Sequence, residues 1–234
     1  MEYIIVICIS AILLVILAII YDVKISTIKK IKKLGFSKEL NEITNKLPEN
    51  KEVCEKILKQ LNNFGSVKVV QNENKNAKAS LYIVVSNTIS IANINKTCTR
   101  IQTVAHECIH SIQNKNLLMF NFIFSNIYIL YFLVISILTI FNKIQNPMLQ
   151  VYILTLFSFI YYKVRSFLET DAMTKAPYVA KEYMKNSNKL TENEITKIMD
   201  NYKIINNLGI KIANFDLFVR CIVKIIIYSV ICFI

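Results

Sequence analysis

Long runs of apolar residues organise the chain. The first, residues 3–21, is uncharged and long enough to cross the apolar core of a bilayer. Two more uncharged runs cover residues 117–141 and 148–162, and a fourth run, 217–234, has Arg220 and Lys224 near its start. The run at 148–162 is short, so a re-entrant segment is an alternative. The tight turn before it favours an antiparallel helical hairpin over residues 117–162. We therefore expect about four transmembrane helices.

The two regions between these runs are polar and largely helical in pattern. Residues 22–116 contain a lysine-rich helix next to the first run and a second helical pattern around residues 51–63. Three strand-like runs follow, and a polar loop joins the first two: 67–71, 81–85 and 88–92, with the loop at 72–78. Residues 163–216 are expected to form charged helices, and Thr191 to Glu194 resembles a capping box. The expected fold class is a mostly α membrane protein with a small α+β part.

Basic residues next to the apolar runs predict the orientation of the chain. Glu2 precedes the first run, and five lysines follow it at positions 24, 29, 30, 32 and 33. This order is the reverse of a cleaved signal peptide, so residues 1–21 are expected to be an uncleaved anchor. The positive-inside rule then places both polar regions in the cytoplasm. The same bias continues at Lys163, Arg165, Arg220 and Lys224.

Composition agrees with a membrane protein. Of the 234 residues, 54% are hydrophobic and 19% are charged, which is too apolar for a typical soluble domain and excludes a disordered tail. The net charge of +12 comes almost entirely from lysine, whereas nucleic-acid readers depend on arginine forks, so we expect no nucleic-acid partner. The six cysteines form no C-x-x-C pair and are expected to be reduced thiols that pack as small hydrophobes.

The two histidines of the chain lie in one motif, His106-Glu107-Cys108-Ile109-His110, which has the pattern H-E-x-x-H. On a helix the two imidazoles lie one turn apart on one face and can bind one zinc ion, and the intervening glutamate can take a proton from zinc-bound water. An apolar stripe runs along the other side of this helix: Ile101, Val104, Ala105, Cys108, Ile109 and Ile112. The alternative is a pair of solvated helix histidines that bind no metal.

A catalytic zinc ion needs three protein ligands, and with no further histidine the third has to be a carboxylate. Glu169 is the best candidate. It lies two turns beyond the third apolar run, on a helix that we expect to end before Pro177. Ala172 and Ala176 share roughly its face and would allow a close approach to the H-E-x-x-H helix. The alternative is that Glu169 only pairs with Arg165, four residues earlier.

Two segments resemble the YugP-like family of neutral zinc metallopeptidases of bacterial membranes. The stretch 104–113, VAHECIHSIQ, resembles that family's A-H-E-V-G-H-A-I-Q helix. The stretch 168–172, LETDA, resembles its second motif, a V-E-F-N-A-S-like segment that follows a hydrophobic hairpin. The N-terminal anchor and the C-terminal apolar helix also match, so the resemblance covers nearly the whole chain.

The resemblance implies one zinc ion per chain, bound by His106, His110 and Glu169, with Glu107 as the general base. It also implies a multi-pass protein of the bacterial cell membrane, in contact with the lipid bilayer and acting on protein or peptide substrates. With the orientation predicted above, the active site would lie at the cytoplasmic face. The α+β region would then be a zinc-peptidase-like part.

Three positions depart from these patterns or select between related families. Cys108 and Ile109 replace the family's V-G, so the local packing must differ. Asp171 stands where asparagine is common, and we expect it to act behind the metal ligands rather than as one of them. Met173 occupies the position of an aspartate in the related heat-shock and CAAX-prenyl membrane proteases, which favours the first family.

The strand-like runs suggest a way to hold a substrate. In many zinc peptidases an exposed edge strand pairs with the substrate backbone, and residues 81–85 and 88–92 are the candidates for such a strand. Ordinary sheet core is an equal alternative for both.

The leading hypothesis is a membrane-embedded zinc metalloendopeptidase. The alternative is a catalytically inactive, protease-like membrane adaptor. A third hypothesis is a membrane protein that binds anionic lipids through the lysines at positions 24–33, although setting the topology is the simpler role for these lysines.

Overall fold

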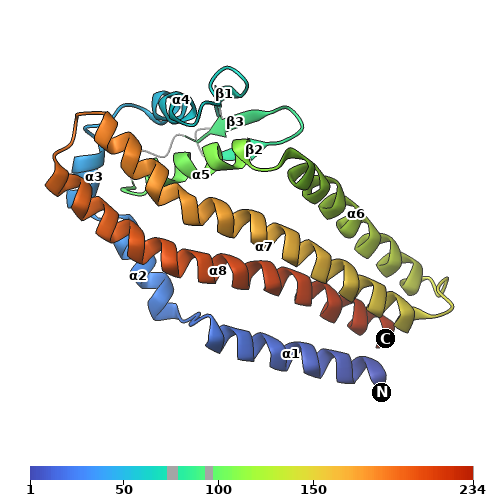
Figure 1. Ribbon diagram of the computed structural model, residues 1–234. Coiled ribbons are helices and arrows are strands. Elements are labelled where there is room, and N and C mark those ends of the chain that lie inside the picture. Colours follow the sequence, from blue (N-terminus) through green and yellow to red (C-terminus); the bar gives the residue numbers. More distant parts are fainter. Residues whose placement is uncertain (73–78, 93–96, 234) are drawn as a thin grey trace. The chain divides into compact units, whose positions relative to one another are not determined.

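The computed structural model describes residues 1–72, 79–92 and 97–233. The protein is mostly helical and contains a small three-stranded sheet (Figure 1). Most of the polar loop predicted at 72–78, and the last residue of the run 217–234, lie outside the described residues.

The chain divides into two compact units, which we describe separately. The helical unit comprises Met1–Lys24, Met119–Phe167 and the chain from Lys211 onward. The sheet unit comprises Ile25–Leu118 and Leu168–Ile210. Three helices (α6, α7 and α8) contain residues of both units, so neither unit is a single stretch of sequence.

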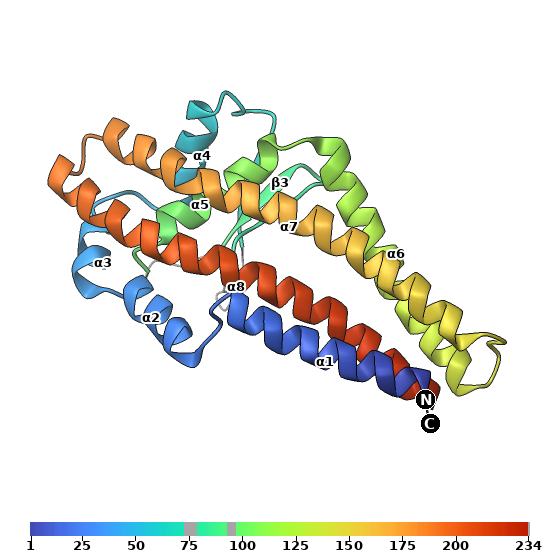
Figure 2. The same ribbon diagram turned by 60° about the horizontal axis from the view of Figure 1, so that its bottom comes forward.

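Four helices supply the helical unit: α1 (Glu2–Ile20), most of α6 (Lys115–Ile140), the first part of α7 (Pro147–Asn186) and the last part of α8 (Glu192–Phe233). Within this unit α6 and α7 form a helical hairpin, and α1 runs alongside the end of α8 (Figures 1 and 2). Helices α1, α6 and α7 are long and apolar enough to cross a membrane.

The expected number of four such helices is therefore wrong for the described residues, which contain three. The fourth run forms the end of α8, and its charges explain the difference. An 18-residue stretch ending at Phe233 includes Asp216, Arg220 and Lys224, and each charge at the centre of a bilayer costs about 3 kcal/mol. The run 217–234 thus carries Arg220 and Lys224 near its start, and Asp216 directly precedes it.

The sheet unit begins with α2 (Ile25–Gly35), α3 (Lys38–Thr44) and α4 (Asn50–Gln60) and continues through β1 (Lys68–Gln71), β2 (Leu81–Ile83), β3 (Thr88–Ile91) and α5 (Arg100–Ile112). The strand order is β1-β3-β2, with β1 parallel and β2 antiparallel to β3. All three strand-like runs in the sequence thus form strands, although each strand is shorter than its run.

This strand order decides between the two alternatives left open for these runs, edge strand and sheet core. Because β3 pairs on both sides, residues 88–92 do not form an edge strand, whereas β2, within residues 81–85, does. Burial gives the physical reason. Ile89 and Ile91 of β3 are fully buried, while Leu81 and Ile83 of β2 are exposed. A strand whose side chains are nearly all buried belongs in the middle of a sheet, between two partners.

Helix α7 does not end before Pro177, as was expected, but continues to Asn186 with the proline inside it. A proline removes one helical hydrogen bond and crowds the preceding turn, at a cost of about 3 kcal/mol. Packing offsets this cost, because Ala172, Ala176 and Ala180 lie fully buried in the core of the sheet unit together with residues of α4 and α5. Tertiary contacts therefore override the local signal of the proline.

The predicted capping box at Thr191 is confirmed. The Thr191 N–H donates to Glu194 Oε2 over 2.9 Å, and the Glu194 N–H donates to Thr191 Oγ1 over 3.3 Å. These reciprocal bonds satisfy backbone donors that the first turn of a helix leaves free, so they define the start of α8.

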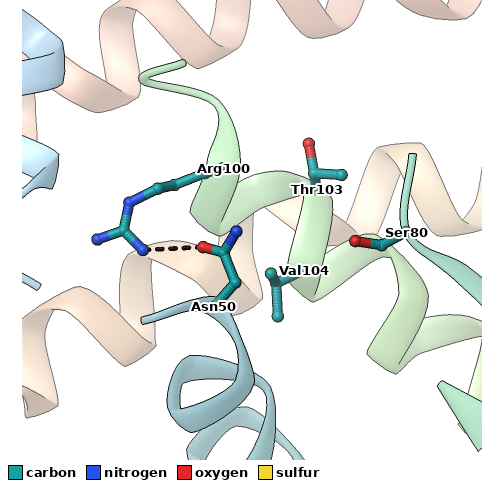
Figure 3. A pocket seen from close by; sticks show the side chains of 5 residues that line it. All are labelled: Asn50, Ser80, Arg100, Thr103 and Val104. Atoms are coloured by element: carbon teal, nitrogen blue, oxygen red, sulfur yellow. Dashed lines mark hydrogen bonds between the residues drawn. The ribbon is translucent and has the colours of Figure 1, made fainter. Parts of the chain in front are cut away.

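Arg100, the first residue of α5, joins this helix to the segment between α3 and α4. Its side chain is buried, and its guanidinium donates to the carbonyl oxygens of Thr44 (2.6 Å), Leu47 (2.9 Å) and Pro48 (2.8 Å). A fourth bond, to Asn50 Oδ1 at 2.9 Å, fixes the start of α4 (Figure 3). One cation thus provides hydrogen-bond donors for carbonyl groups at the end of α3 and just after it, which would otherwise have no partners.

Replacing Arg100 with leucine should lower the free energy of unfolding by about 3 kcal/mol, because it leaves several buried carbonyl groups unpaired. Thermal or denaturant unfolding of the protein in detergent measures this loss. Lys51→Leu, at an exposed lysine of α4, should change stability by less than about 0.5 kcal/mol. Equal effects of the two substitutions would contradict the role given to Arg100.

Candidate metal centre

Helix α5 carries the H-E-x-x-H motif and is held in the core by its apolar stripe. Five of the six predicted stripe residues are fully buried, and the exception is Ile112 near the end of the helix, which is 46% exposed. The polar side of α5 is less open than expected, since Glu107 and His110 are themselves buried. Helix α7 and strand β2 cover this side, so the motif is not a pair of solvated helix histidines.

Three donor atoms converge beside α5. The Nε2 atoms of His106 and His110 are 3.0 Å apart, and Glu169 Oε2 lies 3.3 Å from the first and 3.8 Å from the second. In a tetrahedral zinc site with bonds of about 2.0 Å, neighbouring donor atoms are separated by roughly 3.3 Å. The observed separations bracket this value. The three residues therefore form a group that could hold a metal ion.

Glu169 reaches the histidines from α7. Ala172 and Ala176, one and two turns further along this helix, are fully buried in the same core as the stripe of α5. Their small side chains allow α7 to lie close enough for a glutamate to reach both imidazoles. The structure thus places Glu169 in one group with both histidines, and this group could hold a metal ion.

Gln113, at the end of α5, fixes the orientation of one imidazole. Its Nε2 donates to the Leu168 carbonyl oxygen over 2.9 Å and to Asp171 Oδ2 over 2.8 Å. With the amide nitrogen facing two acceptors, Oε1 has to be the acceptor in the 2.8 Å contact with His110 Nδ1. The proton of a neutral His110 ring is then on Nδ1, and Nε2 keeps its lone pair for the site.

Asp171 lies behind the donors, two hydrogen bonds from His110, and is not one of the three converging groups. Its other oxygen, Oδ1, pairs with Lys175 over 2.6 Å. Burial raises the pKa of Asp171, but the hydrogen bonds from Gln113 and Lys175 outweigh this and bring the net pKa below its usual value. The carboxylate is therefore ionised and can hold the Gln113 amide in place.

The field at the site favours positive charge. Burial lowers the pKa of His110, yet hydrogen bonding and charge from Glu169, together with Gln113 and Glu107, bring its net pKa above the ordinary value. The carboxylates of Glu169 and Glu107 would likewise stabilise a cation placed beside the imidazoles.

Glu107 is held by the edge strand of the sheet. Its Oε2 accepts the Tyr82 N–H of β2 over 2.7 Å. Burial raises the pKa of Glu107, and the nearby His106 and His110 and the bond from Tyr82 offset part of this increase. The glutamate next to the first histidine therefore has a fixed position beside the donor group instead of extending into solvent.

Cys108 lies on the opposite side of α5 and takes no part in the site. Its Sγ is 3.6 Å from Cys54 Sγ in the core, and both thiols are fully buried. Burial, reinforced by Cys54, raises the pKa of Cys108 well above its usual value. It is therefore an uncharged thiol that packs as a small hydrophobe, as expected.

A cleft of about 330 Å³ opens next to His106 and Glu169, between α5, α7 and α8. Met173, Ala176 and Ile205 give it apolar walls. Its polar side chains are Thr99, Gln102, Thr103 and Asn206. Its volume lies within the range of small-molecule and peptide side-chain pockets, so the donor group is accessible to a ligand.

Sequence reasoning gave no role to Gln113, Tyr82 or the α8 residues Ile205 and Asn206. Gln113 was part of the quoted motif, and its position three residues after His110, on the same face of the helix, was the available signal. The other three are brought to the site only by the packing of β2 and α8, which leaves no local trace in the sequence.

No family model, curated protein or solved structure matched the chain. The resemblance to YugP-like peptidases therefore stays a prediction, and the site has to be interpreted from its own geometry.

Gln113→Ala should weaken metal binding by roughly 10- to 100-fold, because the His110 ring loses the acceptor that fixes its orientation. Competition with a chromophoric chelator measures the affinity. Gln60→Ala is the matched control, since Gln60 also donates to a carbonyl of α7, that of Val179, but is not bonded to the histidines. If both variants bound metal like the parent protein, Gln113 would have no positioning role.

Proposed function

We propose that the protein is a membrane-embedded zinc metalloendopeptidase that hydrolyses peptide bonds. One observation carries this proposal: the donor atoms of His106, His110 and Glu169 converge within 4.8 Å of one another, and the Glu107 carboxylate is near enough to interact electrostatically with all three residues. Two imidazoles and one glutamate are the donor set of a well-known class of catalytic zinc sites, which keep one position open for water or substrate.

Zinc is the metal that these donors fit best. Carboxylate-only groups suit magnesium or calcium, whereas two imidazoles with one carboxylate, at the separations found here, suit a small tetrahedral site. When bound, the ion would polarise a substrate carbonyl and lower the pKa of a water molecule.

Glu107 is the proposed general base. The Tyr82 N–H holds Oε2, so Oε1 is the oxygen that takes a proton from water and returns it to the leaving nitrogen. Since the carboxylate is already oriented, little reorganisation is needed when the proton moves. His110, fixed through Gln113 and Asp171, stays in one orientation during this step.

A substrate would be positioned by the cleft and by the edge of the sheet. The cleft beside Glu169 can take a side chain next to the scissile bond, and its apolar walls favour an uncharged one. Strand β2 is an edge strand, as expected for pairing with an extended peptide, although its Tyr82 N–H is occupied by Glu107.

The proposed location is the bacterial cell membrane, with the site at the cytoplasmic face. Three helices long and apolar enough to cross a membrane support membrane association. The lysines that follow α1 support the orientation through the positive-inside rule.

Glu107→Gln should keep the metal and lose roughly 10²- to 10⁴-fold in peptide hydrolysis, because the amide cannot accept the proton. Glu169→Ala should lose the metal as well, while Glu182→Ala, at an exposed glutamate of the same helix, should change neither. Metal analysis and cleavage of a peptide library by the purified protein provide both readouts.

The outcomes separate the hypotheses. A parent protein that binds zinc but cleaves no peptide, and whose cellular role survives Glu107→Gln, would be the inactive adaptor. A parent protein that stays metal-free in the presence of zinc would refute the proposal altogether.

Ile205→Trp should fill part of the cleft and lower kcat/KM for peptides with a bulky residue next to the scissile bond, with the metal content unchanged. Ile204→Trp is the matched control, because the neighbouring Ile204 is 41% exposed and does not line the cleft. The assignment of the cleft fails if both variants cleave all peptides like the parent protein.

A further inference from the structure

Helix α2 has an outer face on which large apolar side chains and lysines are mixed. Ile25, Ile28 and Phe36 are 73%, 51% and 55% exposed. At 100° per residue, these three and the exposed Lys29, Lys32 and Lys33 fall within about 140° of the helix circumference. We call these six residues the outer face of α2. Phe36 belongs to it because its N–H still bonds to the Lys32 carbonyl oxygen over 3.1 Å.

The opposite side of α2 is attached to the sheet unit. Thr27 is buried, and Ile31 and Leu34 are half-buried. The Leu34 carbonyl oxygen accepts the Asn201 side-chain amide over 3.1 Å, and the Gly35 carbonyl oxygen accepts the Cys98 N–H over 3.1 Å. The outer face is therefore not a core face that lacks its partner. It is a second apolar surface on a helix that already has its core contacts.

The charge around this face has one sign. From Ile25 to Lys38 the sequence contains five lysines and no acidic residue, whereas Lys24, just before α2, pairs with Asp22 over 2.7 Å. Only four residues separate the end of α1, a helix able to cross a membrane, from the start of α2. Four residues span at most about 15 Å, so α2 begins close to the surface from which α1 would emerge.

We propose that the outer face of α2 lies on a bilayer surface that contains anionic phospholipids. The isoleucines and the phenylalanine would enter the boundary between headgroups and acyl chains, while the lysines extend to the phosphates. Lysines that only set topology need no apolar neighbours. The exposed Ile25, Ile28 and Phe36 are what distinguish a binding surface from simple orienting charge.

This contact would bear on the metal centre. Cys98, which bonds to Gly35, lies two residues before the start of α5, and α5 carries His106 and His110. A helix fixed on the lipid surface would thus hold the first turn of the metal-binding helix near the membrane, and substrates would be segments at that surface. The lipid contact itself does not depend on the proposed peptidase activity.

Tryptophan fluorescence can test the contact, because the chain contains no tryptophan. Phe36→Trp places a single reporter on the outer face, and Phe64→Trp, at a phenylalanine that is 53% exposed elsewhere in the sheet unit, is the matched control. The full chain would be reconstituted in phosphatidylcholine bilayers with and without phosphatidylglycerol, each containing brominated acyl chains as quenchers.

We expect the Phe36→Trp emission to shift to the blue and to be quenched in the anionic bilayer, and both effects to weaken at about 1 M salt, where the Debye length is about 3 Å. The Phe64→Trp emission should change little. Reversing the charge at Lys29, Lys32 and Lys33 to glutamate should abolish the quenching at position 36, whereas the same change at the exposed Lys51, Lys181 and Lys203 should preserve it.

Three results would overturn the proposal. One is equal quenching at positions 36 and 64, which would show that the outer face of α2 has no preference for the bilayer over another exposed part of the sheet unit. Another is equal quenching at position 36 in both lipid compositions, which would remove the role of anionic headgroups. The third is an identical loss with both triple variants, which would reduce the lysines to their contribution to net charge.

Discussion

The hydrogen bond between His110 and Gln113 is the interaction on which the arrangement of the candidate metal centre depends. A single amide group holds an imidazole of α5 through its oxygen and binds α7 through its nitrogen, at Leu168 and Asp171. It therefore fixes the ring proton and joins the helix with two donors to the helix with the third. Gln113 thus adds directional bonds between the two helices to the contacts that Glu169 itself makes with the imidazoles, and such bonds set a distance more sharply than apolar packing does.

Those parts of the site that depend on local spacing could be predicted from the sequence. Two histidines four residues apart share a helix face whatever surrounds them, and the scarcity of histidine made a carboxylate the expected third donor. The hydrogen bonds that support the donor residues, from Gln113 to Asp171 and from Tyr82 to Glu107, could not be predicted. They depend on how closely α7 and β2 approach α5, and this distance is set by buried alanines and strand pairing far away in the sequence.

The same division holds for the fold. The strand-like runs that become β1, β2 and β3 could be recognised from the sequence. Their order could not, because β1 pairs with β3 and skips the strand that follows it in the chain. The predictions at Pro177 and at residues 217–234 were wrong because each used a local sequence rule alone. Buried alanines keep α7 helical through the proline, and three charged residues accompany the apolar residues of α8.

Helix α5 is held by polar contacts from its first residue to its last turn, and this explains how a short helix can define a metal-sized site. Arg100 binds the chain between α3 and α4, Glu107 binds the edge of the sheet through Tyr82, and Gln113 binds α7. Each contact satisfies groups that would be costly to bury alone. The three converging donor atoms are different, because lone pairs and a carboxylate facing one another gain most from a shared cation.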